Sequence, residues 1–418
     1  MLHSLTVYRS TASPRTLFDQ TIHMKLGTQA RLLILSGSHA VNSVYNRILT
    51  PMLPLIVAEF GLNYAQAGLI VSAYAAGNSL FQYPISFAAD YTGRRRTVLV
   101  LSLIINALPV FFFQWTASYS VLLFLVFISG IGSSAYHPSA VAMTAEEMPS
   151  RRGFVMGIFK AGGDFGSVFT PALAGWLAVY LLSWRTAAQI FVLPGILWAV
   201  LIWFVFQDNP TKRGPIRQEA KATLWGLLGN RALVFMLVLS SCRVMVGRGT
   251  MAFIPLILAE SYGYETTGIG WILTSYYLFG TGSSIVLGKI SDRFKYTSFI
   301  VGMLAATTLV LALMPLASAA WSFFALLIGL AANLGPSQGP VLAVMTEMID
   351  DKSRASSVGL LYTSNEVAGT FSPFIGGLIA QNVGLQQSFL FYAVISAVAT
   401  AAGVAVYRIR ERQILAGG

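Results

Sequence analysis

The 418-residue sequence has few of the residues on which soluble enzymes and disulfide-bonded proteins depend. It contains one cysteine, Cys242, and four histidines, which excludes a disulfide framework and a cysteine-rich zinc or iron–sulfur site. Only 10% of its residues are charged, whereas about a quarter are charged in a typical soluble domain. It also lacks the Gly-x-x-x-x-Gly-Lys-Ser/Thr loop that cradles nucleotide phosphates and the His-Glu-x-x-His arrangement of zinc hydrolases. We therefore expect no enzyme, no ATP-driven pump and no cofactor.

Apolar residues dominate instead. Hydrophobic residues make up 55% of the chain, and the mean hydropathy is +0.67. A membrane-spanning helix needs about 20 apolar residues, so this length accommodates about twelve spans with short loops. Hydropathy predicts these helices at residues 32–58, 65–88, 97–115, 120–147, 153–182, 186–206, 232–258, 267–290, 297–316, 320–348, 355–382 and 387–408.

A polar stretch, Gln207 to Arg231, divides the predicted helices six and six. We expect residues 32–206 and 232–408 to form two helical bundles, with a cytoplasmic linker at 207–231 between them. Residues 1–31 are predicted to be a cytoplasmic arm and residues 409–418 a cytoplasmic tail, because neither segment contains a spanning apolar run.

The net charge of +11 does not indicate a nucleic-acid partner, because the cations are not gathered on one soluble face. Of the 27 lysines and arginines, only Arg185 falls in a loop on the side opposite the N-terminus, and four fall within helices. Lysine and arginine accumulate in short cytoplasmic loops because they resist translocation. The distribution therefore predicts a multi-pass protein of the inner or plasma membrane with both termini in the cytoplasm.

The two halves of the chain are related in sequence. An offset of 202 residues places Pro138 on Pro340 and Asp164 on Glu366, and an offset of 201 places Arg47 on Arg248. Both halves keep the same orientation, so we expect an all-α fold of twelve transmembrane helices in two parallel six-helix bundles. Parallel repeats of this kind are typical of transporters that alternate access to a central site.

The loop after the second predicted helix resembles the signature loop of the major facilitator superfamily. Its residues are Ala89-Asp90-Tyr91-Thr92-Gly93-Arg94-Arg95-Arg96, and a second copy follows the eighth helix at Gly288-Lys289-Ile290-Ser291-Asp292-Arg293. Both copies are degenerate, but each keeps the aspartate and basic residues. The resemblance implies a secondary transporter with a cavity between two six-helix bundles. It also implies that Asp90, Gly93, Arg94, Asp292 and Arg293 take part in gating.

Three shorter stretches resemble the fosmidomycin-resistance-like branch of that superfamily. They are Ser38-His39 with Asn42, Gly132-Ser133-Ser134-Ala135-Tyr136-His137-Pro138, and Gly162-Gly163-Asp164-Phe165-Gly166. This branch implies a proton-driven exporter and identifies no substrate.

Ionisable residues inside the predicted helices point to an anionic substrate. Each costs about 2.5–3.5 kcal/mol to insert, so such residues usually line a cavity and serve function. The four cations are Arg47, Lys160, Arg243 and Arg248, and the two carboxylates are Asp164 and Glu366. A bound anion would neutralise the surplus of positive charge, and guanidinium groups from both halves would clamp a carboxylate or phosphonate. The alternative is that these arginines bond to helix carbonyls or extend to the membrane surface.

Arg47 and Arg248 are the predicted leading pair of this clamp, because they occupy equivalent positions in the two halves. Arg243 is the third candidate, although it points about 140° away from Arg248 on an undistorted helix. His39, Asn42 and Asn46 share a face of the first helix with Arg47 at its margin, and we predict that this polar stripe also contacts substrate. Tyr45-Asn46-Arg47 loosely resembles the first helix of organic-anion and organophosphate carriers.

Proton coupling requires a group that titrates as its exposure changes. Asp164 and Glu366 are candidates, and His137 is a candidate because histidine titrates nearest neutral pH. Lys160 precedes Asp164 by four residues, so the two side chains share a helix face and can form an ion pair. That pair, and a packing role for His137 beside Pro138, are the structural alternatives.

We therefore expect a monomeric secondary transporter of a small anionic organic solute, coupled to protons and embedded in the bilayer. Efflux of hydrophobic drugs is the alternative transport function, and a non-transporting membrane receptor is the alternative from another class.

Overall fold

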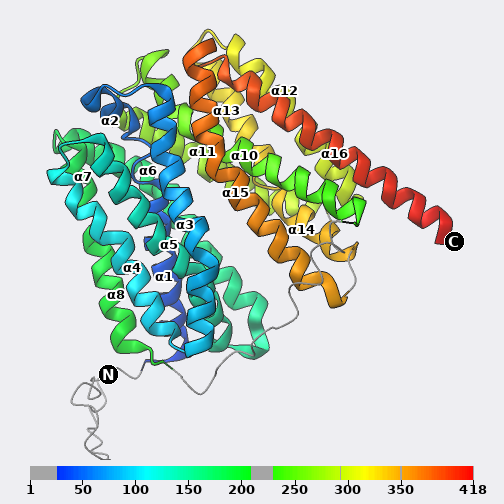
Figure 1. Cartoon of the computed structure of the whole chain (residues 1–418), viewed down its shortest axis with the longest axis horizontal. Helices are drawn as coiled ribbons and strands as arrows, with labels where there is room; N and C mark the ends of the chain where they lie inside the picture. The colour runs from blue at the N-terminus through cyan, green and yellow to red at the C-terminus, as the bar shows by residue number, and fades with distance from the viewer. Residues whose placement is uncertain (1–25, 209–228, 292, 349–350, 418) are drawn as a thin grey trace, which may run out of the picture.

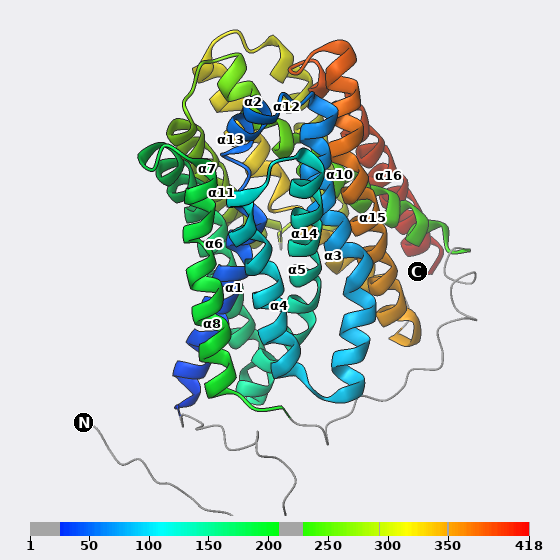
Figure 2. The ribbon, with the colours of Figure 1, turned by 60° about the vertical axis from the view of Figure 1, so that its left-hand side comes forward.

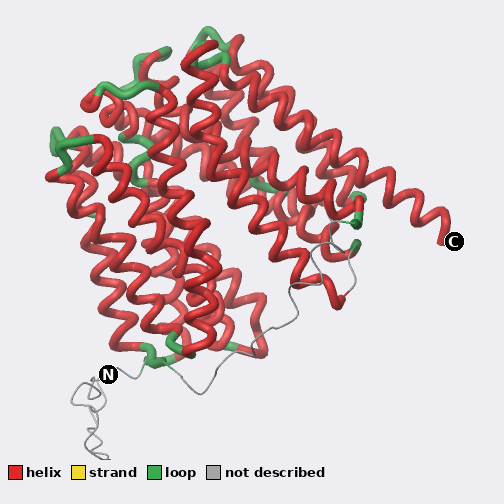
Figure 3. Tube along the Cα trace, in the orientation of Figure 1, coloured by secondary structure: helices red, strands yellow, loops and turns green. Residues whose placement is uncertain are grey.

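A computed structural model of the chain describes residues 26–208, 229–291, 293–348 and 351–417, and these contain helices and no strand (Figure 3). The helices of the first half are α1 (Thr28–Arg47), α2 (Leu53–Phe60), α3 (Tyr64–Thr92), α4 (Arg95–Phe112), η1 (Phe113–Trp115), α5 (Tyr119–Glu147), η2 (Pro149–Arg151), α6 (Arg152–Tyr180), α7 (Trp184–Ile190) and α8 (Val192–Val205). The second half contains α10 (Arg231–Glu260), α11 (Thr266–Ser291), α12 (Tyr296–Leu313), η3 (Met314–Leu316), α13 (Ala320–Leu334), α14 (Gln338–Glu347), α15 (Asp351–Val383) and α16 (Ser388–Gly417).

These elements form the predicted twelve spanning segments, and the predicted all-α fold is confirmed. Among the described residues, seven segments are long and apolar enough to cross a membrane by length and composition. The remaining five segments are α1 and α2 taken together as one, α3, α6, α11 and α15. Four of these five segments form the main contacts between the halves, α3 with α15 and α6 with α11.

The prediction of one continuous first helix over 32–58 is wrong. Helix α1 ends at Arg47, five residues of turns follow, and α2 begins at Leu53. Pro51 and Pro54 explain the break, because proline lacks an amide hydrogen and clashes with the preceding turn of a helix. Arg47 therefore lies at a helix end and not in mid-helix. The predicted helix 320–348 is also divided, at Gly335 to Ser337, where Pro336 has the same effect.

The two halves lie side by side, and their ribbons converge toward one end (Figure 1). Helix α3 packs against α15, as Figure 2 also shows, and α6 packs against α11. Glycines permit this approach: a Cβ on Gly68 would come within 2.2 Å of the Pro373 carbonyl oxygen, and one on Gly270 within 2.4 Å of the Pro171 carbonyl oxygen. Ser72 Oγ also accepts a hydrogen bond from the Phe374 amide at 3.2 Å.

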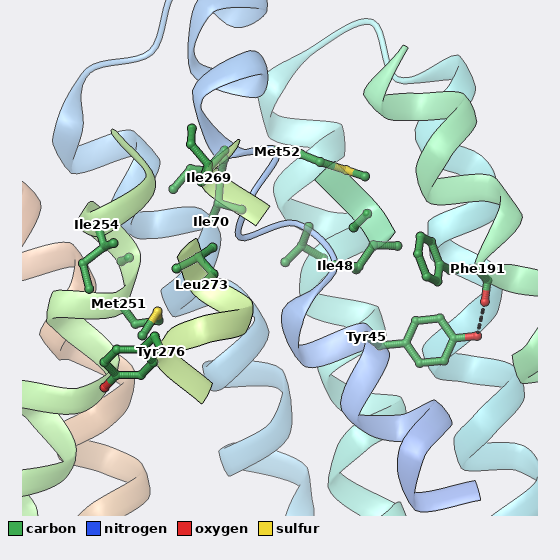
Figure 4. Close-up of a cluster of buried hydrophobic side chains, with 14 of the residues drawn as sticks. Tyr45, Ile48, Met52, Ile70, Phe191, Met251, Ile254, Ile269, Leu273 and Tyr276 are labelled. Atoms are coloured by element: carbon green, nitrogen blue, oxygen red, sulfur yellow. Dashed lines mark hydrogen bonds between the residues drawn. The ribbon is translucent and has the colours of Figure 1, made fainter. Parts of the chain in front are cut away.

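Buried apolar side chains from both halves close this end, which we call the sealed end. Figure 4 shows that they come from the α1–α2 break (Ile48, Met52), α3 (Ile70), α10 (Met251, Ile254) and α11 (Ile269, Leu273, Tyr276). Each of these side chains is less than a tenth exposed. Beside them, the Tyr45 hydroxyl donates to the Phe191 carbonyl at 2.9 Å and fixes the end of α1 against α8 (Figure 4).

The opposite end carries the loop cations, and we call it the basic end. It includes Arg94 to Arg96 at the start of α4, Arg151 and Arg152 at the start of α6, and Lys295 before α12. The ribbons of α3 and α15 diverge toward this end (Figure 1). Leu80 and Tyr83 in this part of α3 are 65% and 78% exposed, whereas residues near its start are buried. The halves are therefore closed together at one end of the molecule and separated at the other.

Candidate substrate site

Arg47 extends from the end of α1 to the other half of the molecule. Its guanidinium carbon lies 4.5 Å from the centre of the Tyr277 ring on α11, which is cation–π geometry. Its Nε atom is buried and has no hydrogen-bond partner among the described residues, and the Tyr277 hydroxyl is buried without a partner as well. The face of a tyrosine ring does not neutralise a guanidinium, so Arg47 keeps its charge and a free donor.

Arg248 on α10 is bound to a carboxylate. Its Nη2 atom lies 2.7 Å and 2.8 Å from the two carboxylate oxygens of Glu366 on α15. Glu366 Oε2 also accepts a hydrogen bond at 3.2 Å from Ser79 on α3, and the Ser79 and Thr370 hydroxyls are 3.1 Å apart. Glu366 thus joins an arginine of its own half to a serine of the other half. Arg248 Nη1 remains buried without a partner in the described chain.

Arg243 lies five residues before Arg248 on α10. Its Nε atom is buried, and no acceptor among the described residues bonds to it. The phenol of Tyr362 on α15 is near enough to interact with it electrostatically, but no carboxylate of the described residues pairs with it. The side chain therefore presents a second charged guanidinium that is not neutralised.

The sequence repeat places equivalent residues in different surroundings. Asp164 bonds at 2.5 Å to Lys160, one turn earlier on α6, and this lysine is 68% exposed. The residue equivalent to Lys160 in the second half is Tyr362, which has no charge to offer Glu366. Glu366 pairs with Arg248, whereas Arg47, the equivalent of Arg248, has no carboxylate partner among the described residues. The two acidic residues at equivalent positions of the repeat therefore have different cationic partners, Lys160 for Asp164 and Arg248 for Glu366.

The predicted polar stripe on α1 is divided between two environments. His39 stacks on Phe159 with ring centroids 4.3 Å apart, and its Nδ1 atom lies 2.8 Å from the Phe159 carbonyl oxygen. His137 contacts the edge of the same imidazole at 5.3 Å. Asn42 is buried and accepts from Asn106 at 3.2 Å, whereas Asn46 is exposed. His39, His137 and Asn42 thus pack within the first half, and their roles in binding or coupling stay predictions.

The predicted gating residues that the structure describes lie at the basic end. Asp90 accepts from Arg95 at 2.9 Å, and Arg95 bonds to Glu146 on α5 at 2.8 Å; all three residues belong to the first half. Gly93 ends α3 with φ +67°, a conformation that strongly favours glycine.

Arg94 directly precedes α4 and is exposed, and Arg293 is exposed in the turn after α11. Asp292 lies outside the described residues. No contact of these side chains crosses to the other half in the described chain, and their part in gating stays a prediction.

One sequence match to the Gly-x-Ser-x-Gly pattern of serine hydrolases occurs at Gly335-Pro336-Ser337-Gln338-Gly339. Ser337 is fully buried at the break between α13 and α14, and its hydroxyl donates to the Leu334 carbonyl at 2.7 Å. No histidine contact with Ser337 is found among the described residues. The match reflects a proline-induced helix break and not a nucleophile.

Two residues of the site are not among those predicted from the sequence. Tyr277 covers Arg47, and Ser79 connects Glu366 to the other half. Single tyrosines and serines are common in apolar helices, so neither residue type by itself indicates a substrate-site residue in the sequence. Their positions depend on how α11 and α3 pack against the opposite half.

The Major Facilitator Superfamily profile matches residues 35–265 and 236–416. The chain belongs to this superfamily. It is 26% identical over 392 residues to a probable sulfoacetate transporter, SauU, of Cupriavidus necator, covering 87% of this chain and 89% of that protein. It is 22% identical to the fosmidomycin resistance protein of Escherichia coli (84% and 86% covered) and 24% identical to a cis,cis-muconate transport protein of Acinetobacter baylyi (82% and 85% covered).

The fold is similar to that of a bacterial homologue of the human lysosomal transporter Spinster, solved in an inward-facing and occupied conformation. The TM-score is 0.81 at 19% identity, and the match covers 92% of this chain and 98% of the other. The protein is therefore a multi-pass membrane transporter with the major facilitator fold, and it is not an enzyme.

Proposed function

We propose that this transporter carries a small organic anion with two acidic groups. The observation that carries the proposal is the excess of positive charge between the halves. Of Arg47, Arg243 and Arg248, only Arg248 pairs with a carboxylate among the described residues, that of Glu366, and each guanidinium keeps a buried nitrogen without an acceptor there. A buried donor without a partner is costly, and an anionic oxygen would satisfy it with a strong, charge-assisted hydrogen bond.

Arg47 comes from the first half and Arg243 from the second, so an anion that bound both would bridge the halves. Sulfoacetate and cis,cis-muconate, which appear in the names of two relatives, each carry two acidic groups. This chemistry supports a substrate that engages two separate guanidinium groups. A lipophilic cation would add charge to a site that is already positive, so the observations favour an anion over a cationic drug.

We propose further that Glu366 couples transport to protons. Protonation would remove the charge that holds Arg248 and would leave that guanidinium available to substrate. It would also weaken the bond from Ser79, which lies where α3 and α15 join the halves. The same event would then strengthen anion binding and loosen the contact that must open. Asp164 is the weaker candidate because Lys160 already neutralises it.

We also propose how the protein is oriented in the membrane and that it functions as a monomer. The cations at the basic end follow the positive-inside rule, which supports placing that end and both termini in the cytoplasm. Each of the proposed site residues comes from this one chain, and we propose that the monomer transports.

The proposal can be tested with purified protein in liposomes that contain a pH-sensitive dye. The panel is sulfoacetate, cis,cis-muconate, a neutral sugar and a lipophilic cation. We expect the two dianions alone to move protons, Arg47→Gln to abolish the signal, and Lys289→Gln to preserve it. Lys289 is an exposed basic-end cation outside the site and serves as the matched control. Proton movement with the lipophilic cation, or full activity of Arg47→Gln, would contradict the proposal.

A further inference from the structure

A groove of about 1030 Å³ lies between the first turns of α10 and the last turns of α16, and it is formed by the second half alone. Its lining includes Arg231 and Phe235 from α10, and Val404, Arg408 and Arg412 from α16. Arg231, Arg408 and Arg412 are exposed. The groove is separate from the proposed substrate site, which lies between the halves.

The lining changes from apolar to basic along the groove. On α16, Ala401, Val404, Ala405, Arg408 and Arg412 recur at intervals of three or four residues and share one helix face. This face spans roughly 16 Å at 1.5 Å per residue. On α10 the order is reversed because the helix runs the other way, and Arg231 precedes the apolar groove residues. All three arginines therefore lie at the same end of an apolar channel.

Among the described residues, no carboxylate neutralises these arginines. Two neighbours on α16 are paired, since Arg410 bonds to Glu347 at 2.6 Å and Glu411 to Lys295 at 3.2 Å. Arg231, Arg408 and Arg412 form no ion pair among the described residues. Arg410 points away from the groove and Glu411 lies at its flank, and neither of these pairs includes an arginine of the groove.

Both helices are long and apolar enough to span a membrane, and the arginines lie in their terminal turns. Cations at a helix end reach the headgroup layer, whereas apolar residues one or two turns deeper lie among acyl chains. The groove thus places positive charge at headgroup depth and an apolar floor below it.

We propose that this groove binds an anionic phospholipid, with its phosphate on the three arginines and an acyl chain along Phe235 and Val404. Charge complementarity and the apolar floor next to the arginines favour a lipid over free phosphate as the ligand, because free phosphate would contact only the basic end of the groove. This inference does not depend on the proposed substrate or on proton coupling.

The test uses the full-length purified protein in detergent and native mass spectrometry with phosphatidylglycerol and phosphatidylcholine of the same acyl chains. A cation near an anionic lipid contributes about fivefold in affinity, which corresponds to ~1 kcal/mol. The Arg408→Gln/Arg412→Gln variant is therefore expected to bind phosphatidylglycerol about 25-fold more weakly and phosphatidylcholine unchanged. The control Arg151→Gln/Lys289→Gln removes two exposed cations outside the groove and should bind as the unmodified protein does.

A second variant tests the apolar floor independently. Val404→Trp should fill the groove and weaken the binding of both lipids. The inference is overturned if the Arg408→Gln/Arg412→Gln variant binds phosphatidylglycerol normally, or if both charge variants lose affinity equally. Displacement of the lipid by millimolar inorganic phosphate would also overturn it, because the site would then be one for a free anion.

Discussion

Replacing Glu366 by glutamine removes a single negative charge from the contact between the halves and keeps the size of the side chain. The glutamine carbonyl can still accept from Arg248, and its amide can still bond to the Ser79 hydroxyl. We therefore expect the Glu366→Gln variant to fold and to differ from the unmodified protein mainly in charge. In the proposed mechanism it represents the protonated state permanently.

The size of the effect follows from the geometry of the pair. An anion on the free side of the Arg248 guanidinium would lie about 7 Å from the Glu366 carboxylate, and at an effective dielectric constant of about 20 the two would repel each other by about 2 kcal/mol. Removing this repulsion would tighten anion binding roughly 30-fold, and solvent at the quarter-exposed carboxylate (24%) would reduce that to about tenfold. In the unmodified protein, affinity should rise as the pH falls, because protonation of Glu366 has the same effect. In the variant it should be high and independent of pH.

The assay is binding of radiolabelled cis,cis-muconate to the purified protein across a pH series, followed by uptake into liposomes. Uptake driven by a pH gradient should be lost in Glu366→Gln, whereas exchange of internal for external anion should persist. Glu260→Gln is the matched control, since that carboxylate accepts from Tyr64 at 2.6 Å at the sealed end. Retained pH-dependent binding in Glu366→Gln, or an equal effect of the control, would refute the reasoning.

Two further variants test the site and the sealed end. Asp164→Asn should leave the pH dependence of anion binding unchanged. It should lower the free energy of unfolding by at most about 0.5 kcal/mol, because Asp164 pairs with an exposed lysine one turn away. Loss of the pH dependence in this variant would show that Asp164 is a coupling group. Gly68→Val should prevent closure of the sealed end, because the added Cβ would lie 2.2 Å from the Pro373 carbonyl oxygen. We expect it to abolish transport and to increase labelling of a cysteine at the sealed end by an impermeant thiol reagent, whereas Gly282→Val, where the space is open, should do neither.

The fold could be predicted closely from the sequence because the bilayer fixes the length and apolarity of each spanning segment. The first segment and the segment at 320–348 are exceptions, because each is divided at a proline. Pro51 and Pro54 were visible in the sequence, but hydropathy counts residues and does not register the loss of amide hydrogens. The break matters for the site because it puts Arg47 at a helix end, where its side chain reaches Tyr277 on α11.

The arrangement of the charges could be predicted only where local geometry decides it. The pair of Lys160 and Asp164 follows from their spacing on one helix. The bond between Arg248 and Glu366 depends on how α10 packs against α15, and no spacing along the chain encodes that packing. The repeat suggests that Arg47 and Arg248 are equivalent. Their surroundings nevertheless differ: Asp164 pairs with Lys160, whose equivalent in the second half is Tyr362, and α1 ends at Arg47, whereas α10 continues past Arg248.

The most direct test of the central claim is a binding comparison of Arg47→Gln, Arg243→Gln and the double variant with a two-charge anion such as cis,cis-muconate. A hydrogen bond to a charged group contributes about 1.5–3 kcal/mol, so each single variant should bind roughly 10- to 150-fold more weakly. For an anion with one acidic group, the double variant should bind only slightly more weakly than the single variant that has the lower affinity. If both single variants bind the two-charge anion as tightly as Lys289→Gln does, the two arginines do not form the anion site.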